Sequence, residues 1–112
     1  MLLDLELRQE TLFIRPQGEL DLAAADHFRH TLEQALDKEP VRNLVFNLAG
    51  VTFIDSSGLG VLLGRYKRVS KNGGKVMLVS PQPQVRRILE LSGLFRIMKE
   101  LASESDALAK IG

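Results

Sequence analysis

The sequence of 112 residues contains no cysteine, and it has no large excess of positive or negative charge. Without cysteine, disulfide bonds and thiolate sites for zinc or an iron–sulfur cluster are excluded. The 15 basic residues are balanced by 14 acidic ones, which leaves a formal net charge of +1. This balance gives no general reason to expect nucleic acid or an anionic membrane as a partner.

Long apolar runs are also missing. No stretch approaches the roughly 20 residues that a membrane-spanning helix needs. The first residues, Met1 to Glu6, lack the basic-then-apolar pattern of a secretory signal. We therefore expect a cytoplasmic protein. No linker, low-complexity tract or long repeat divides the chain, so residues 1–112 are predicted to form one domain. A domain of this length buries enough surface to fold without disulfide bonds.

Alternating leucines and acids over residues 2–7 predict a half-buried strand. A second strand is expected over residues 11–15, and together they suggest an antiparallel hairpin whose register is open because no Asn-Gly turn joins them. Residues 18–21 are expected to interrupt this pattern. Asp21 is then the predicted N-cap of a helix over about residues 22–38, whose apolar residues recur at three- and four-residue spacing.

In the middle of the chain, the apolar run at residues 44–48 predicts a central strand covered on both faces. Residues 51–54 are expected to belong to a short loop. Helical periodicity begins at Leu59, and Gly73-Gly74 is expected to end that helix. Its predicted exposed face, interpreted as solvated rather than as a binding patch, carries Arg65, Lys67, Arg68 and Lys71.

The last third of the sequence predicts a buried strand over residues 76–79, then a helix that Pro81 and Pro83 start and Gly93 stops. Residues 95–98 are expected to form a short strand. The Ser-x-x-Asp pattern at residues 103–106 has the form of a capping box and predicts a C-terminal helix.

The expected order is therefore β-β-α-β-α-β-α-β-α. Strands separated by helices imply crossover connections and a parallel sheet, and the hairpin supplies an antiparallel N-terminal edge. The predicted fold is an α/β sandwich with helices packed on a mostly parallel central sheet.

The turn Asp55-Ser56-Ser57-Gly58 is the candidate functional segment, because it presents two hydroxyls and a carboxylate where a helix begins. In open α/β sheets, ligands gather outside the carboxyl ends of the strands. Free backbone N–H groups and the helix dipole favour an anion there. A purely structural interpretation is that Ser56 or Ser57 caps the helix while Asp55 ends the strand, which is what these residue types usually do.

Two kinds of enzyme are disfavoured by the residues around this turn. The glycines at 58, 60 and 64 approach a dinucleotide fingerprint, but the third is one residue late and no acid follows the next strand to hold a ribose. A serine nucleophile needs a base, and nothing places His27 or His30 beside Ser56. These histidines also lack a third metal ligand, so no metal site and no catalytic residue are predicted.

A third possibility is that the serine is itself a substrate. A serine at a helix N-terminus beside glycine is accessible to a kinase. Its phosphate would add about −1.5 to −2 charge at a surface that already carries Asp55. Such a modification abolishes a protein contact without unfolding anything.

Several blocks of the sequence support this last possibility by resemblance. Asp55-Ser56-Ser57-Gly58-Leu59-Gly60, continuing to Gly64-Arg65-Tyr66-Lys67, resembles the signature of the anti-sigma factor antagonists, which are STAS domains, and Gly18-Glu19-Leu20-Asp21 is similar to the early loop of that family. The resemblance covers essentially the whole chain. The segments that look most like its sporulation branch, which controls sigma F, are Ser80-Pro81, Val85-Arg86-Arg87 and Leu91-Ser92-Gly93-Leu94-Phe95.

The resemblance implies a regulatory module without catalytic activity or a cofactor of its own. Its expected partner is an anti-sigma factor that is also a serine kinase and that binds ATP and magnesium. The unphosphorylated antagonist binds this kinase and frees the sigma factor, phosphorylation of Ser56 releases the antagonist, and a PP2C-type phosphatase resets it. The partner-binding residues expected by the same resemblance are Asp21, Asp55, Ser56, Ser57, Gly58 and Leu59.

Alternatives remain at this stage. Ser57 is the expected helix cap, although modification of Ser57 with Ser56 as the cap stays open. The partner could belong to a general stress-response module, or the chain could be a small nucleotide-binding protein. One departure from the family pattern is the segment Leu22-Ala23-Ala24-Ala25, which follows the early loop where polar residues are common.

Overall fold

The computed structural model describes residues 1–111, which begin with an antiparallel hairpin of β1 (Leu2–Arg8) and β2 (Thr11–Leu20). Leu3, Leu5 and Leu7 pack against the core while Asp4 and Glu6 are exposed, so the predicted half-buried strand is confirmed. Gln9 and Glu10 form the two-residue turn, with φ values of 48° and 68°. Positive φ at both positions is the geometry of a type I′ turn, and it fixes the register that the sequence left open.

Strand β2 runs further than the sequence predicted, because residues 18–20 are not a loop. Gly18 has φ +109° and the register shifts between Gly18 and Glu19, so the strand continues past a bulge. Its first part pairs with β3 (Asn43–Asn47), and its last residues pair with β4 (Val51–Ile54).

The expected loop at residues 51–54 is likewise wrong. Residues 51–54 form strand β4, whose burial does not alternate. Its first and last residues are buried, while Thr52 and Phe53 are exposed. It forms only because Gly18, Glu19 and Leu20 offer it a parallel neighbour, which is a partnership that sequence periodicity does not reveal.

The strands form one six-stranded sheet in the order β1-β2-β3-β5-β6, with β4 beside β2. Of the strand pairs within residues 1–111, only β1–β2 is antiparallel, so the predicted mixed α/β class is confirmed with one additional strand. Strand β5 (Val76–Val79) lies where predicted, whereas the expected strand at 95–98 is wrong. Gly93 adopts φ 83°, a 3₁₀ turn follows over Leu94–Arg96, and β6 (Lys99–Leu101) starts only after it.

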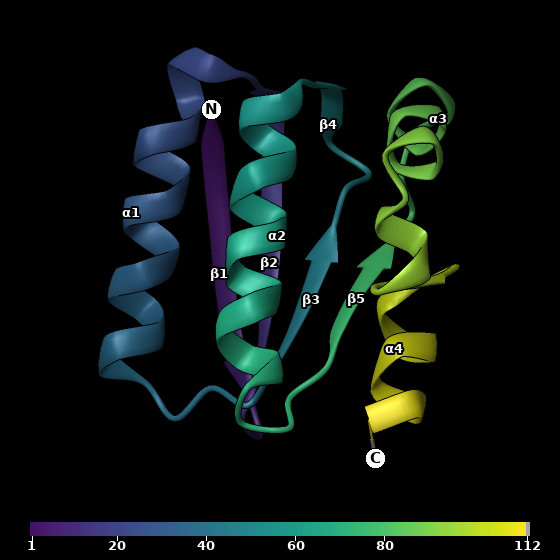
Figure 1. Ribbon diagram of the computed structural model, residues 1–112. Helices are drawn as coiled ribbons and strands as arrows, with labels where there is room; N and C mark the ends of the chain where they lie inside the picture. Colours follow the sequence, from purple (N-terminus) through teal and green to yellow (C-terminus); the bar gives the residue numbers. More distant parts are fainter. Residues whose placement is uncertain (112) are drawn as a thin grey trace.

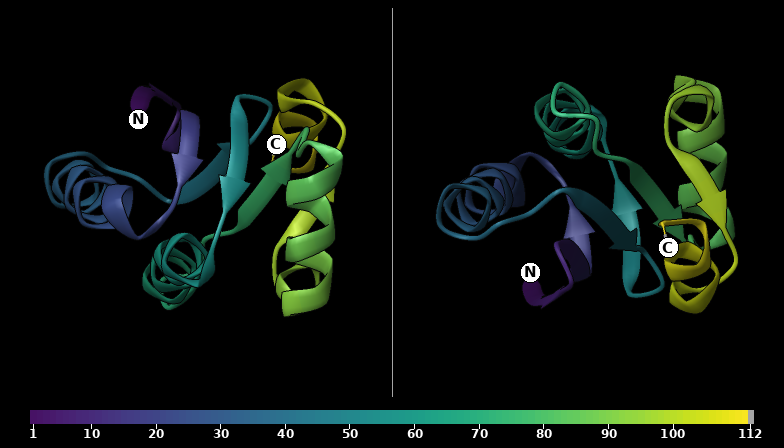
Figure 2. Two further views of the ribbon diagram at one scale, coloured as in Figure 1. Left: turned by 90° about the horizontal axis from the view of Figure 1, so that it is seen from above. Right: turned by 90° about the horizontal axis from the view of Figure 1, so that it is seen from below.

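Helices cover both faces of the sheet (Figures 1 and 2). The predicted helices are confirmed as α1 (Leu22–Lys38), α2 (Ser56–Ser70), α3 (Pro83–Ser92) and α4 (Glu104–Ile111). Side chains of α1, α2 and α3 join the larger core cluster, in which the Phe28 and Phe46 rings meet edge-on at 6.3 Å between centroids. A smaller cluster beneath α4 contains Val45, so β3 is buried on both faces as predicted.

The buried face of α2 differs from the predicted one. Arg65, which was expected to be solvated, lies on the buried side of the helix. Its Nε lies 3.1 Å from Glu33 Oε2 of α1, and burial lowers the pKa of Arg65. Arg68, also expected on the exposed face, is half-buried and pairs with Glu33 and Asp37. The sequence pattern of α2 alone could not show that α1 supplies carboxylates to this side.

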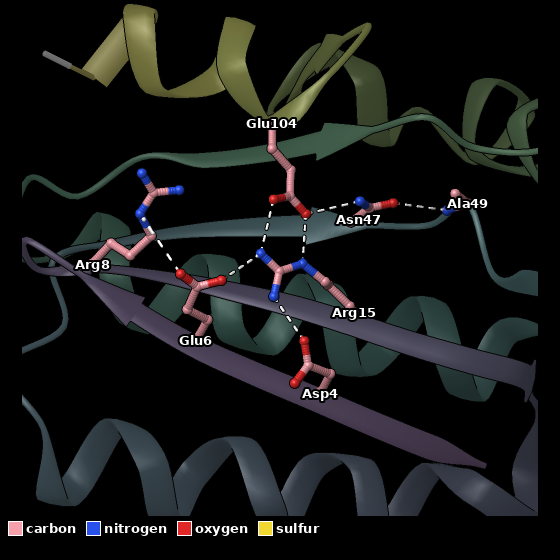
Figure 3. A network of polar contacts seen from close by, with 7 residues as sticks. All are labelled: Asp4, Glu6, Arg8, Arg15, Asn47, Ala49 and Glu104. Atoms are coloured by element: carbon pink, nitrogen blue, oxygen red, sulfur yellow. Dashed lines mark hydrogen bonds and ion pairs between the residues drawn. The ribbon is translucent and has the colours of Figure 1, made fainter.

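A polar network ties α4 to the hairpin (Figure 3). Arg15 of β2 donates to both carboxylate oxygens of Glu104 at 2.8 and 2.9 Å, and to Asp4 and Glu6 of β1 at 2.7 Å each. The Asn47 amide also donates to Glu104 at 2.8 Å. The hydrogen bonds from Arg15 lower the pKa of the Glu104 carboxyl, so the network is strongest when that group is ionised.

At the start of α4, the Ser103 hydroxyl oxygen accepts a hydrogen bond from the Asp106 backbone N–H at 3.1 Å, as the capping pattern predicted. Across residues 1–111, no helix combines the length and the apolar character that a bilayer crossing requires.

Candidate functional site at the start of helices α1 and α2

Two helices begin side by side at the carboxyl ends of β2 and β4. Strand β2 leads through Asp21 into α1, and β4 leads through Asp55 into α2. Both helix N-termini therefore lie at the same end of the molecule, the upper end in Figure 1. The parallel pairing of Leu20 with Ile54 brings these two connections together. This is the edge of the sheet where the sequence placed the candidate functional segment.

Asp55 is the residue that joins the two connections. Its Oδ1 accepts hydrogen bonds from the backbone N–H groups of Ser57 at 2.8 Å and Gly58 at 3.1 Å. Its Oδ2 accepts one from the backbone N–H of Leu22, the first residue of α1, at 3.0 Å. One carboxylate thus caps α2 and fixes α1 beside it.

The prediction that a serine caps α2 is therefore wrong. Asp55 is the N-cap, because β4 delivers it with extended backbone angles (φ −113°, ψ −173°) that place its carboxylate over the first N–H groups of the helix. The helix consequently begins at Ser56, three residues before the expected start of helical periodicity at Leu59. The anion site that the sequence suggested at this helix start is filled by the side chain of Asp55.

Asp21 plays the corresponding part in α1, as predicted. Its backbone is extended and its Oδ1 accepts a hydrogen bond from the Ala24 backbone N–H at 3.1 Å. Its side chain is only half-buried. A cavity of about 300 Å³ lies beside it, lined by Met1, Glu19, Asp21, Ala23 and Ala24.

Gly58 allows the close approach of the two connections. A Cβ at this position would overlap the carbonyl oxygen of Leu20 and lie 2.9 Å from Ile54 Cγ1, whereas one at Gly60 or Gly64 would meet nothing within 4 Å. Gly58 is thus required for packing. Together with the filled N–H groups, this argues against the nucleotide alternative, in which these glycines would leave room for a phosphate.

The two serines are left free by this arrangement. Ser56 is exposed as the first residue of α2, while Ser57 and Leu59 are half-buried. Within residues 1–111, neither serine hydroxyl forms a hydrogen bond, because Asp55 performs the capping. Leu22 adds an apolar side chain that is 75% exposed to the same end of the molecule. The site therefore combines accessible hydroxyls, carboxylates and one exposed leucine.

The histidines do not contribute to this site. His27 and His30 are both exposed on α1. In the part of the chain that the structure describes, no three His, Asp or Glu side chains gather in a way that could hold a metal ion.

The fold and the site together define a small α/β module whose candidate site is a surface formed by two capped helix starts. The chain belongs to the STAS domain family, whose family model matches residues 3–107. The match confirms the resemblance that the sequence blocks suggested.

Relatives of the chain fall within the same group. It is 37% identical over 109 residues to an anti-sigma F factor antagonist of Paenibacillus polymyxa, covering 97% of this chain and 93% of the relative. It is 29% identical over 107 residues to the anti-sigma-B factor antagonist of Bacillus subtilis, covering 92% of each.

Solved structures of the anti-sigma factor antagonist SpoIIAA are also similar. The unphosphorylated form matches with a TM-score of 0.86 and 33% identity, covering 98% of this chain and 96% of that one. The phosphorylated form, from Bacillus, matches with a TM-score of 0.78 and 32% identity, covering 99% and 100%. SpoIIAA has therefore been described in both states.

Proposed function

We propose that this chain is an anti-sigma factor antagonist switched by phosphorylation of Ser56. In this proposal the unphosphorylated chain binds an anti-sigma factor through the start of α1 and α2, and so frees a sigma factor. The contact residues are Asp21, Asp55, Ser56, Ser57, Gly58 and Leu59. The proposal is supported by similarity to an anti-sigma F factor antagonist and to SpoIIAA, whose structure is known in unphosphorylated and phosphorylated forms.

The main observation behind the proposal is that Asp55, and not Ser56, caps α2. Asp55 caps α2, so the exposed Ser56 hydroxyl is free to react and its modification leaves the cap intact. Ser57 has the same freedom but is half-buried, which favours Ser56 as the modified residue.

The proposed partner is an anti-sigma factor that is also a serine kinase and itself binds ATP and magnesium. The Ser56 oxygen attacks the γ-phosphorus of ATP, ADP leaves, and the hydroxyl proton is released. In the complex, the new phosphate then faces the phosphates of the nucleotide that the partner binds. Like-charge contacts across an interface cost several kcal/mol, which corresponds to a 10²- to 10³-fold loss of affinity. A PP2C-type phosphatase restores the binding form.

A sigma F-type partner is favoured over a stress-response partner by sequence similarity. The identity is 37% to the sigma F antagonist and 29% to the sigma-B antagonist. Capture of both kinds of anti-sigma factor by the immobilised chain separates these possibilities, and exclusive capture of the sigma-B type would reject sporulation control. Leu22, exposed where the family commonly carries polar residues, is expected to influence this choice.

Intact mass spectrometry after incubation with the kinase and MgATP tests the modified residue. A gain of one phosphate, about 80 Da, is expected for the wild-type chain and for Ser57→Ala, and none for Ser56→Ala. A phosphate that persists in Ser56→Ala and disappears in Ser57→Ala would assign the switch to Ser57 instead. No gain on any of the three would reject the phosphorylation switch.

A further inference from the structure

Three lysines converge on a cavity at the end of the molecule opposite Ser56. Lys75 immediately precedes β5, Lys99 is the first residue of β6, and Lys110 lies in the last turn of α4. All three line the same cavity, which has a volume of about 340 Å³. In Figure 1 this is the lower end, where β5 begins and α4 ends, whereas α1 and α2 start at the upper end.

The topology brings these lysines together from distant parts of the sequence. Parallel pairing aligns Met77 of β5 with Lys99 of β6, so Lys75 lies at the start of the strand next to Lys99. Helix α4 packs over these strands and ends at the same edge. A lysine in its last turn is favoured by the negative end of the helix dipole, which explains the position of Lys110 but not of the other two.

Among the described residues 1–111, no acidic side chain pairs with this cluster of lysines. Within that part of the chain, no Asp or Glu lines the cavity, none of the three lysines forms an ion pair, and the ion pairs use arginine. Repulsion from Lys110, with a smaller effect of Lys75, lowers the pKa of Lys99. Ammonium groups gathered without a carboxylate form a ready site for an anion.

The walls of the cavity are apolar and aromatic. Its lining includes Tyr66 of α2, Ile97, which is 41% exposed, and the buried Met77. Tyr66 and Ser70, which each carry a hydroxyl, are also among the lining residues. A volume in this range accommodates a small organic molecule, and apolar walls with a few polar groups are typical of ligand sites.

We propose that this cavity binds a small organic anion in which a phosphate group is attached to an aromatic or apolar body. The phosphate contacts the ammonium groups of Lys75, Lys99 and Lys110, since lysine binds phosphate as a point charge. The body packs against Tyr66, Met77 and Ile97. Because the site lies at the opposite end from Ser56, this binding is independent of the proposed partner switch.

Titration with phenyl phosphate, followed by NMR of the backbone amides at about 0.15 M NaCl, tests this site. Saturable shifts are expected at the lining residues, with phenyl phosphate binding about threefold or more tighter than inorganic phosphate. Shifts that only follow ionic strength, or that centre on Ser56, would overturn the proposal. Equal affinity for both probes would overturn the role of the apolar wall.

Matched lysine variants complete the test. The double variant Lys99→Gln/Lys110→Gln is expected to weaken phenyl phosphate binding about tenfold or more, because two nearby positive charges are lost. Lys71→Gln removes an exposed lysine outside the cavity lining and is expected to leave the affinity unchanged. The double variant relieves repulsion, so its Tm is expected to be equal or higher. Equal weakening by Lys71→Gln, or no weakening by the double variant, would contradict the proposal.

Discussion

The carboxylate of Asp55 accepts a hydrogen bond from the backbone N–H of Leu22 at 3.0 Å, across 33 positions of sequence. Because the same side chain also caps α2, the two helix starts that form the candidate site are held by one residue. The relative position of Asp21 and Ser56 therefore depends on Asp55. This relationship leads to the first prediction.

Replacing Asp55 with alanine is expected to lower the free energy of unfolding by about 1–3 kcal/mol, since one N-cap and the bond to Leu22 are lost together. Ser57→Ala serves as the control and is expected to change stability by less than about 0.5 kcal/mol, because its hydroxyl does not cap the helix. Urea denaturation measures both. A larger loss in Ser57→Ala than in Asp55→Ala would reject the capping role of Asp55.

The second prediction concerns the glycines of α2. Gly58→Ala is expected to destabilise the chain by about 2 kcal/mol or more, because its Cβ meets the backbone of Leu20 and that backbone must shift. Gly64→Ala, in open space within the same helix, is expected to stabilise it by about 0.5–1 kcal/mol. Thermal unfolding of the two variants tests whether their stability changes have opposite signs. A Gly58→Ala variant as stable as the wild type would contradict the close contact between Gly58 and Leu20.

The third prediction concerns the buried cation between α1 and α2. Arg65 Nη1 is buried without a hydrogen-bond partner in residues 1–111, so its guanidinium depends on the charge of Glu33 at 3.1 Å. Glu33→Gln is expected to cost about 1–3 kcal/mol of stability, because it leaves this charge buried and unpaired.

Adding Arg65→Met to Glu33→Gln is expected to recover most of that loss, since the unpaired charge is then removed. Asp37→Asn is the control, because Asp37 is exposed and its bridge to Arg68 is expected to contribute less than about 1 kcal/mol. Chemical denaturation of the three variants provides the comparison. A double variant as unstable as Glu33→Gln would show that Arg65 is not the source of the loss.

The fourth prediction is a pH dependence from Glu104. Arg15 lowers the pKa of this carboxyl in the folded chain, so its contribution is fully present above the unfolded pKa of about 4.3 and is lost as pH falls through the folded value. Glu104→Gln is thus expected to lower stability at pH 7 by about 1–2 kcal/mol, and this deficit should shrink as the solution is acidified toward pH 3.

Asp106→Asn is the matched control for Glu104→Gln, because it removes a carboxylate from the same helix turn that lies outside the Arg15 network. Both variants lose a favourable interaction with the helix dipole, so their difference reports the contacts of Glu104 with Arg15 and Asn47. Urea denaturation at several pH values measures it. A deficit in Glu104→Gln that is constant from pH 7 to pH 3 would contradict the prediction.

Much of the fold could be predicted because local patterns specify it. The alternating leucines of β1, the Asp21 cap of α1 and the Ser103 cap of α4 each depend on residues close in sequence. Strand β4 could not be predicted, because its pairing with β2 is long-range and its burial does not alternate. The burial of Arg65 was missed for a similar reason, since its carboxylate partner lies on another helix.

At the candidate site, the sequence predicted that a helix begins near residues 55–58 but not which residue caps it. Aspartate and serine are both good N-caps, and only the extended backbone at Asp55 decides that the aspartate caps α2. The signal that could have shown this is the position of Asp55 directly after a strand, once residues 51–54 are recognised as one. The contact between Gly58 and Leu20 likewise follows from strand pairing rather than from local sequence.

The most direct test of the proposed switch is the affinity of the chain for its anti-sigma factor before and after phosphorylation, measured by titration calorimetry in the presence of MgADP. The proposal predicts that stoichiometric phosphate on Ser56 weakens binding by about 10²-fold or more, while Ser56→Ala binds as the unmodified chain does. Phosphorylated and unphosphorylated chains that bind with equal affinity would contradict the central claim.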